Sequence, residues 1–158
     1  MNPVIQFFKD FFSNYLLMSA LSGWFIAQIV KTIICLFNKE KVGLSMLLFS
    51  NGGMPSSHSA TVMALCTASF IHGGAASPTF AISLILASVV MIDASGVRYE
   101  TGKQAQILNK ITRELFSGKP EEFNTGLKEL VGHTPFQVLV GAALGIVIAI
   151  GMSFIMTV

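Results

Sequence analysis

Long apolar segments separated by short polar breaks predict several membrane-spanning helices in this chain. No Asp, Glu, Lys or Arg occurs from Val42 to Ile92, whereas about a quarter of the residues in an ordinary soluble domain are charged. A bilayer core requires about 20 apolar residues per helical span. Four segments fit this pattern: 15–37, 57–72, 79–97 and 135–158. We therefore expect an all-α fold, an integral membrane helical bundle, in which the short second span is tilted or shielded by its neighbours.

Two further regions are amphipathic. Residues 3–12 place four phenylalanines on one helical face, which predicts either a short interfacial helix or an extension of the first span. Residues 98–132 hold 11 of the chain's 18 charged residues, with apolar positions at helical spacing. We expect two amphipathic helices there, lying at the membrane surface. The chain 1–158 is predicted to be one domain, in which 98–132 is a charged insert.

The composition argues against several classes of protein. A net charge of +2 does not suggest a nucleic-acid binder, which would carry a basic patch. Cys35 and Cys66 lie in apolar segments and form no CxxC or Cys/His cluster, so we expect buried thiols, no disulfide and no metal site. The sequence shows no internal repeat and no polar stripe along the middle of a span, which argues against a transporter or channel component.

The distribution of positive charge predicts the orientation. Four spans put both chain ends on one side of the membrane, and the junctions between spans one and two and between spans three and four on the other. That second side carries nine of the ten Lys and Arg residues. The positive-inside rule places it in the cytoplasm, and we expect a bacterial cell membrane.

The polar groups that are energetically unfavourable inside a membrane lie on that same side. A Lys or Asp at mid-bilayer costs about 2.5–3.5 kcal/mol on insertion scales, so Lys31 and Asp93 are expected to be functional or paired. Lys31 could instead extend to the headgroups. Asp93 could form a local ion pair with Arg98, or it could orient that guanidinium toward a phosphate, whose oxygens a guanidinium fork binds well.

Two short motifs add histidines to this side. Residues 55–58 (Pro-Ser-Ser-His) begin the second span and could act only as a helix cap. A helix N-terminus with free N–H groups, two hydroxyls and a His is also a phosphate cradle, which we favour. Residues 133–135 (His-Thr-Pro) begin the last span, where a lone His would usually be structural; a second His on the same side favours chemistry. His72 lies on the opposite side and is expected to be structural.

Both motifs resemble those of the type 2 phosphatidic acid phosphatase superfamily, which includes the vanadium haloperoxidases. Residues 55–58 are similar to its Pro-Ser-Gly-His motif, and 133–145 to its last motif, in which a Pro and a Gly-Ala run follow a nucleophilic His. Lys31 lies where that superfamily has a Lys at the end of an early helix. The divergent bacterial and plant branch is most similar, because there a long insert separates Gly-Val-Arg from His-Thr-Pro-x-Gln-Val.

The chain departs from the superfamily pattern at several positions. Asn38-Lys39 replaces an Arg-Pro pair, and Ser57 replaces the Gly of Pro-Ser-Gly-His. The superfamily has an Arg six residues before the nucleophilic His, and this position is Leu127 here. The resemblance therefore implies that Arg98 takes the role of that Arg.

The most serious departure is Gln137, which replaces the Asp four residues after the nucleophilic His. A carboxylate orients the imidazole and stabilises its positive charge, whereas a Gln only orients it. Asp93 or Glu129 would then supply the charge, or the enzyme is slow, or turnover has been lost.

The resemblance implies a metal-independent lipid phosphatase without a cofactor. The nucleophile would be His133, which forms a phosphohistidine, and the acid and base would be His58, with Gln137 and Asp93 supporting them. The implied phosphate-binding residues are Lys31, Ser56, Ser57, Arg98 and, as a weaker candidate, Lys103.

The implied substrate is a phospholipid or an isoprenoid phosphate. Phosphatidylglycerophosphate comes first and phosphatidic acid second, and the partners are membrane lipids. A non-catalytic protein that binds lipid headgroups is the main alternative, and a vanadate haloperoxidase a weaker one. Gly141-x-x-x-Gly145 predicts close helix packing, either inside the chain or at the seam of a homodimer.

Overall fold

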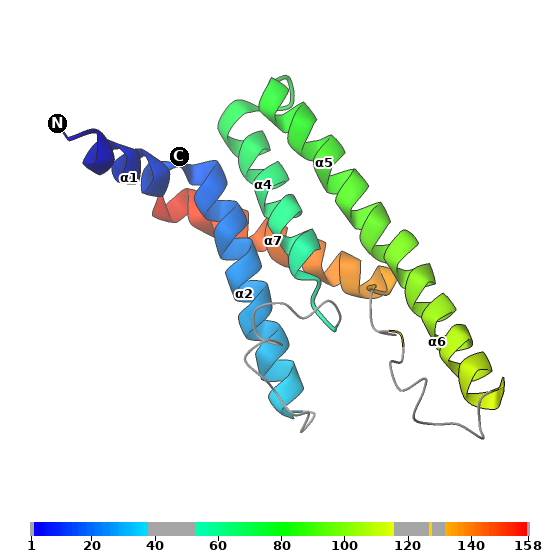
Figure 1. The fold of residues 1–158 in the computed structure, drawn as a ribbon. Coiled ribbons are helices and arrows are strands. Elements are labelled where there is room, and N and C mark those ends of the chain that lie inside the picture. The colour runs from blue at the N-terminus through cyan, green and yellow to red at the C-terminus, as the bar shows by residue number, and fades with distance from the viewer. Residues whose placement is uncertain (1, 38–52, 116–126, 128–131, 158) are drawn as a thin grey trace.

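The described residues fold mainly into helices (Figure 1). The computed structural model describes residues 2–37, 53–115, 127 and 132–157. Its helices are α1 (Pro3–Ser13), α2 (Tyr15–Phe37), α4 (Ser57–Gly73), α5 (Pro78–Ser95), α6 (Val97–Leu115) and α7 (Pro135–Ile155). Within these ranges no strand occurs, so the predicted all-α fold is confirmed.

Three helices begin at hydroxyl side chains, as their sequences predict. Ser56, Ser77 and Thr134 each accept the backbone N–H of the residue three positions later, at 3.2–3.3 Å. Pro78 and Pro135 follow two of these caps at the first helical position, where a missing N–H costs no hydrogen bond. Local chemistry therefore sets the starts of α4, α5 and α7.

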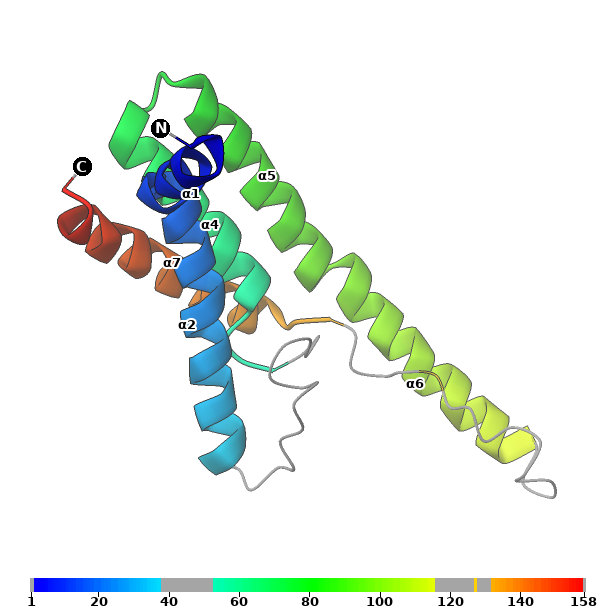
Figure 2. The same cartoon turned by 60° about the vertical axis from the view of Figure 1, so that its left-hand side comes forward.

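Helix α4 is the centre of the bundle, because α2, α5 and α7 all pack against it. Figures 1 and 2 place both chain ends at one end of the molecule, next to the start of α2. Away from this end, the starts of α4 and α7 lie beside the junction of α5 and α6. The arrangement brings distant parts of the sequence to one end of the bundle, as the four-span topology predicts.

Small residues allow the helices to approach closely. A Cβ added to Gly23 of α2 would lie 2.9 Å from the carbonyl oxygen of Ala60. On α7, a Cβ on Gly141 would collide with the Ser56 backbone, and one on Gly145 with the Ala60 backbone. The Gly141-x-x-x-Gly145 pattern is thus an internal contact with α4, and a homodimer remains a prediction that would need another surface.

Large apolar side chains lie on the outside of this bundle. Phe25, Ile85 and Phe154 are 59%, 64% and 80% exposed, while the buried set is mostly alanine and serine. An apolar surface of this extent is unfavourable in water. In a bilayer the large side chains face lipid and the small ones pack between helices, so the fold is that of a helical membrane protein.

The lengths of the helices test which of the four predicted spans could cross a membrane. Among the described helices, α2, α7 and the continuous α5–α6 segment are long and apolar enough to cross a membrane. Helix α4 has 17 residues, about 25 Å of helix, slightly less than a hydrocarbon core of about 30 Å. Three of the four predicted spans therefore meet the requirement, and α4, shielded by its neighbours, remains a predicted span.

Helix α6 continues the direction of α5 in both views (Figures 1 and 2). The Gly96 N–H donates to Ile92 O at 2.8 Å, and Glu100 N–H donates to Gly96 O at 3.0 Å, so hydrogen bonding runs through the junction. The first predicted amphipathic helix is present as α6, which forms one rod with α5 (the α5–α6 rod). Its position at the membrane surface remains a prediction. The second predicted amphipathic helix falls, apart from Leu127, outside the described residues.

Helix α1 is separate from α2. The chain is extended at Asn14 (φ −76°, ψ 100°), whose Oδ1 accepts the Leu17 N–H at 3.1 Å. Helix α1 buries no residue, and Phe7 and Phe8 on it are exposed. The expectation of a simple extension of the first span is wrong, and an interfacial position for α1 remains a prediction.

We predict that Gly145→Ala lowers stability by about 1–3 kcal/mol, because the new methyl group overpacks the contact with α4. Thermal unfolding of the detergent-purified protein measures this. The control is Gly151→Ala on the same helix, which meets nothing within 4 Å and should be neutral or slightly stabilising. Unchanged unfolding of Gly145→Ala together with a changed oligomeric state would mean that this glycine pair lies between two copies.

Candidate functional site

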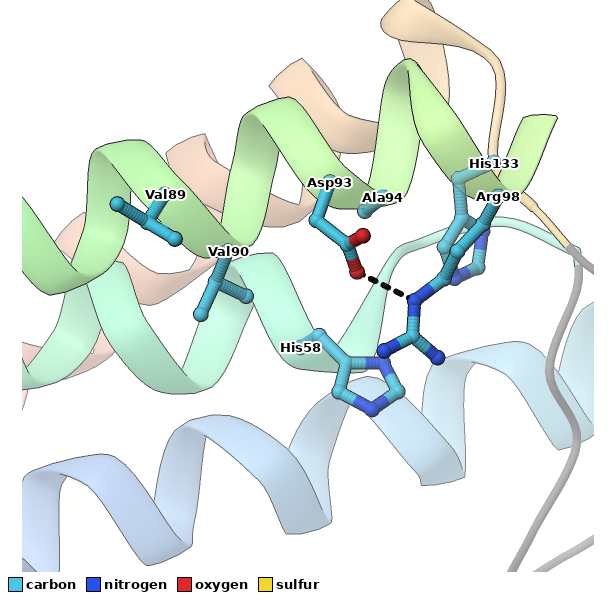
Figure 3. A pocket seen from close by; sticks show the side chains of 7 residues that line it. All are labelled: His58, Val89, Val90, Asp93, Ala94, Arg98 and His133. Carbon is cyan, nitrogen blue, oxygen red and sulfur yellow. Dashed lines mark hydrogen bonds and ion pairs between the residues drawn. The ribbon is translucent and has the colours of Figure 1, made fainter. Parts of the chain in front are cut away.

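A cavity of about 220 Å³ opens where α4, α5 and α6 meet the start of α7 (Figure 3). Three segments that are distant in the sequence contribute side chains to its wall: the start of α4, the junction of α5 and α6, and the residues before α7. The lining residues are His58, Val89, Val90, Asp93, Ala94, Arg98 and His133. The structure thus brings together both histidines, the carboxylate and the arginine that the sequence analysis selected.

His133 is held by the interrupted end of α5. Its backbone N–H donates to the Ala94 carbonyl at 3.0 Å, one of the carbonyls that a helix end leaves without a partner in the next turn. The preceding Gly132 packs so closely on Tyr99 that an added Cβ would collide with the Tyr99 backbone. A glycine is therefore required directly before His133.

Gln137 fixes the orientation of the His133 ring. Its Oε1 accepts the Thr134 backbone N–H at 3.1 Å, and a backbone N–H can only donate, so the carbonyl end of the amide must face this way. The His133 Nδ1 lies 3.4 Å from the same oxygen and can bond to it only as a donor. The long hydrogen bond therefore favours the tautomer with a proton on Nδ1 and a lone pair on Nε2.

The surroundings of His133 favour the neutral imidazole. The side chain is only 3% exposed. Burial, followed by the positive charge of Lys31, lowers the pKa of His133, and the hydrogen bonds to Gln137 and to the Gly53 backbone only partly oppose this. The neutral ring is the form that can act as a nucleophile.

Arg98 and Asp93 form an ion pair at the mouth of the cavity. The Arg98 Nε lies 2.5 Å from Asp93 Oδ2, and Figure 3 shows the remaining guanidinium nitrogens directed toward His58. The predicted local ion pair is thus present and holds the guanidinium fork, and phosphate binding by that fork remains a prediction. In the described part of the chain, the hydrogen bond of Asp93 goes to Arg98 and not to His133. Glu129, the other predicted acid, lies outside the described residues.

Lys31 does not extend to the headgroups. It is only 4% exposed, and its aliphatic stem passes Gly53, where an added Cβ would lie 3.9 Å from its Cγ and Cδ. Its charge acts on both His58 and His133. The predicted convergence of Lys31 with the two histidines is therefore present in the fold.

The other predicted phosphate ligands have different surroundings. Ser56 is fully buried, and its hydroxyl accepts hydrogen bonds from Ser59 N–H and Ser59 Oγ, so it serves as a helix cap. Ser57 is 3% exposed. Lys103 is half exposed, bonds to Glu100 at 2.9 Å and is not brought to the cavity wall. Phosphate binding by these three residues remains a prediction.

The sequence analysis missed three residues of the wall, Val89, Val90 and Ala94. The two valines precede Asp93 by four and three residues on α5, and helical periodicity places such positions on the same face. That spacing could have identified them. Across the described ranges, no group of three or more His, Cys, Asp or Glu side chains could hold a metal ion.

Comparison with known proteins agrees with the motifs. The sequence model of the Divergent PAP2 family matches residues 12–148, so this chain belongs to that family. It is 36% identical over 155 residues to the uncharacterized membrane protein YuiD of Bacillus subtilis (strain 168), covering 92% of this chain and 98% of the relative. No solved structure matches. Phosphatase activity is suggested at the level of the family.

We predict that Gln137→Glu raises the pKa of His133. A carboxylate can keep the hydrogen bond to the Thr134 N–H while adding a negative charge that favours the imidazolium. In the wild type we expect His133 to titrate below the ordinary value of about 6.5, because burial and Lys31 lower its pKa. Nitrogen NMR of histidine-labelled protein measures both values.

The chain has three histidines, so His58→Ala and His133→Ala variants assign the signals. The control is Gln106→Glu, the same change at an exposed position of α6, which should leave the titration of His133 unchanged. An equal pKa in the Gln137→Glu and wild-type proteins would show that Gln137 does not contact the ring.

Proposed function

We propose that this protein is a membrane lipid phosphatase that hydrolyses a phosphomonoester through a phosphohistidine intermediate. One observation carries the proposal: His58 and His133 line one cavity together with Arg98, in a helical membrane protein of a PAP2-related family. Two imidazoles provide a nucleophile and a proton carrier, and a guanidinium fork binds phosphate oxygens. The proposal therefore uses the groups at the cavity and needs no metal.

In the first step, the lone pair on His133 Nε2 attacks phosphorus. A P–N bond forms while the P–O bond to the lipid alkoxide breaks. The negative charge of the bound phosphate offsets the positive charges of Arg98 and Lys31 and so allows His58 to hold a proton in the complex. His58 gives this proton to the departing oxygen, so the lipid leaves as a neutral alcohol. Arg98 and Lys31 stabilise the charge on the three equatorial oxygens, where it is spread in the transition state.

In the second step, water attacks the phosphohistidine. His58, now neutral, takes a proton from this water while a new P–O bond forms. The P–N bond breaks, its electron pair returns to His133 Nε2, and inorganic phosphate leaves. Both histidines then have their starting protonation states, so the cycle consumes only water.

The wall of the cavity favours a lipid over a soluble ester. Val89 and Val90 extend it away from Arg98 along α5, and Val89 is 60% exposed on a helix that is apolar on its outer surface. The first methylene groups of a substrate could therefore contact valine while its phosphate meets Arg98. Phosphatidylglycerophosphate is the first candidate, followed by phosphatidic acid and isoprenoid phosphates, and the positive-inside rule assigns the site to the cytoplasmic face.

The second candidate function is a non-catalytic protein that binds lipid headgroups, and Gln137 favours it. The described contacts of His133 include the Gln137 amide and no carboxylate, so the positive ring formed during transfer has less stabilisation than a family Asp would give. Such a protein would bind lipid phosphates and release none.

Phosphate release from a panel of lipid phosphates tests the proposal. We expect release by the detergent-purified protein, its loss in His133→Ala, a decrease of about 10²- to 10⁴-fold in His58→Ala, and no effect of a chelator. The control is His72→Ala, which removes the exposed histidine at the far end of α4. Full turnover by His133→Ala would refute the mechanism, and binding without release by the wild type would support the headgroup-binding function.

We predict that Val90→Ser lowers kcat/KM for a long-chain lipid phosphate by about tenfold, since it removes about 1.5 kcal/mol of apolar contact. Turnover of a short soluble phosphomonoester should change little, because it does not reach the valines. Val147→Ser is the control, at an exposed valine of α7 away from the cavity. An equal loss for both substrates would show that Val90 supports the fold and not a lipid chain.

A further inference from the structure

Asn109 is a buried polar residue in α6, well beyond the cavity. It is 9% exposed. Its Nδ2 donates to the Leu127 carbonyl at 2.8 Å, and its Oδ1 accepts the Leu127 N–H at 2.9 Å. A side-chain amide offers one donor and one acceptor side by side, so Asn109 binds both backbone polar groups of Leu127, as a neighbouring β-strand residue would.

This contact is the first of three between the α5–α6 rod and the chain that leads to His133. Asn109 binds Leu127, the Tyr99 backbone packs on Gly132, and the Ala94 carbonyl accepts the His133 N–H. The three contacts follow one another toward the N-terminus along the α5–α6 rod, but toward the C-terminus along residues 127–133. The described residues 127, 132 and 133 therefore meet the rod in antiparallel order, and the last contact is that of His133.

The length of the chain couples these contacts. Asn109 and Tyr99 are ten residues apart on a helix, about 15 Å. The five residues from Leu127 to Gly132 can reach at most about 18 Å. A Leu127 that is held at Asn109 therefore limits how far along the helix Gly132 can lie, and Gly132 directly precedes His133.

We propose that Asn109 is a positioning residue for His133: by holding the Leu127 peptide, it sets where the imidazole lies in the cavity. It is not one of the residues that line the cavity, so its effect on His133 would act through the chain. Its consequence for catalysis rests on the proposed function, whereas its effect on the position of His133 does not.

The position of His133 determines both its pKa and its reactivity. Among the described residues, the charged or titratable groups around the cavity come from α2, α4, α5 and α6. They are Lys31, His58, Asp93 and Arg98. A ring that shifts out of this site becomes less buried and more distant from Lys31, so its pKa rises toward about 6.5. The nucleophile also loses alignment, and a shift of about 1 Å lowers turnover by about 10²-fold.

The test compares Asn109→Leu, which keeps the size and removes both hydrogen bonds without adding charge, with the wild type. The control is Gln106→Leu, which makes a comparable change at an exposed position of the same helix. Nitrogen NMR gives the titration of His133, kinetics give kcat and KM, and thermal unfolding gives the folded fraction. We expect Asn109→Leu to raise the pKa of His133 and to lower kcat by about ten- to a hundredfold, with a smaller change in KM, while Gln106→Leu matches the wild type.

Loss of folded protein alone would lower apparent turnover and leave the titration of His133 unchanged. A folded Asn109→Leu protein with wild-type kcat and wild-type titration would overturn the proposal. If Asn109→Leu does not fold, Asn109→Asp decides: it keeps the acceptor for Leu127 N–H but places a second oxygen against the Leu127 carbonyl. A shifted His133 titration supports the proposal, and an unchanged one overturns it.

The NMR measurement requires no turnover. If the wild type releases no phosphate from any lipid, the proposed function fails, while the titration of His133 in the Asn109 variants still decides the positioning role. Conversely, an active enzyme in which Asn109→Leu changes nothing retains the proposed function and loses this inference.

Discussion

One hydrogen bond joins the two helix starts on which the site depends. The Ser56 backbone N–H, at the cap of α4, donates to the Gln137 carbonyl in the first turn of α7 at 3.2 Å. It can form only because Gly141 has no side chain and lets α7 approach the Ser56 backbone. His58 follows Ser56 by two residues and His133 precedes Gln137 by four. The glycine contact thus fixes the relative position of two histidines that are 75 residues apart in the chain.

Charge in the cavity suits an anion. Lys31 and Arg98 are two cations near the histidines, and Asp93 is the carboxylate paired with one of them. A phosphate monoester, the substrate that we propose, would bring negative charge to both cations. The charge of Lys31 also favours the neutral form of His133, because a positive neighbour opposes protonation.

The sequence predicts those parts of the fold that depend on local patterns. Residues 15–37 form α2 as expected. In lipid, a single apolar segment can satisfy its backbone hydrogen bonds only by forming a helix. The helix caps at Ser56 and Thr134 could also be predicted, because each cap binds a residue only three positions away. The family was also identified from two motifs, and the topology brings both of them to one cavity.

Features that depend on tertiary contacts were not predictable in this way. The direction of α6 depends on hydrogen bonds that continue through Gly96, although a glycine usually suggests a helix end. Lys31 is buried beside Gly53, which is 22 positions away in the chain, and the hydrogen bonds from Asn109 to Leu127 join residues 18 positions apart. Neither of these two contacts produces a periodic pattern in the sequence. Gln137 was only partly predictable. The sequence shows that a carboxylate is absent at this position, but only the structure shows that the Thr134 N–H fixes the orientation of the Gln137 amide.

The exchange of Asp for Gln at position 137 has two opposite electrostatic effects. A carboxylate there would raise the pKa of His133 and so place a larger fraction of the ring in the protonated, non-nucleophilic form. A neutral amide keeps the lone pair on Nε2 available in a site that already contains two cations. It also gives less stabilisation to the positive ring that forms with the P–N bond. In the proposed mechanism the amide therefore favours attack by a neutral nucleophile and leaves the phosphohistidine less stable, so that its hydrolysis, assisted by His58, follows more readily.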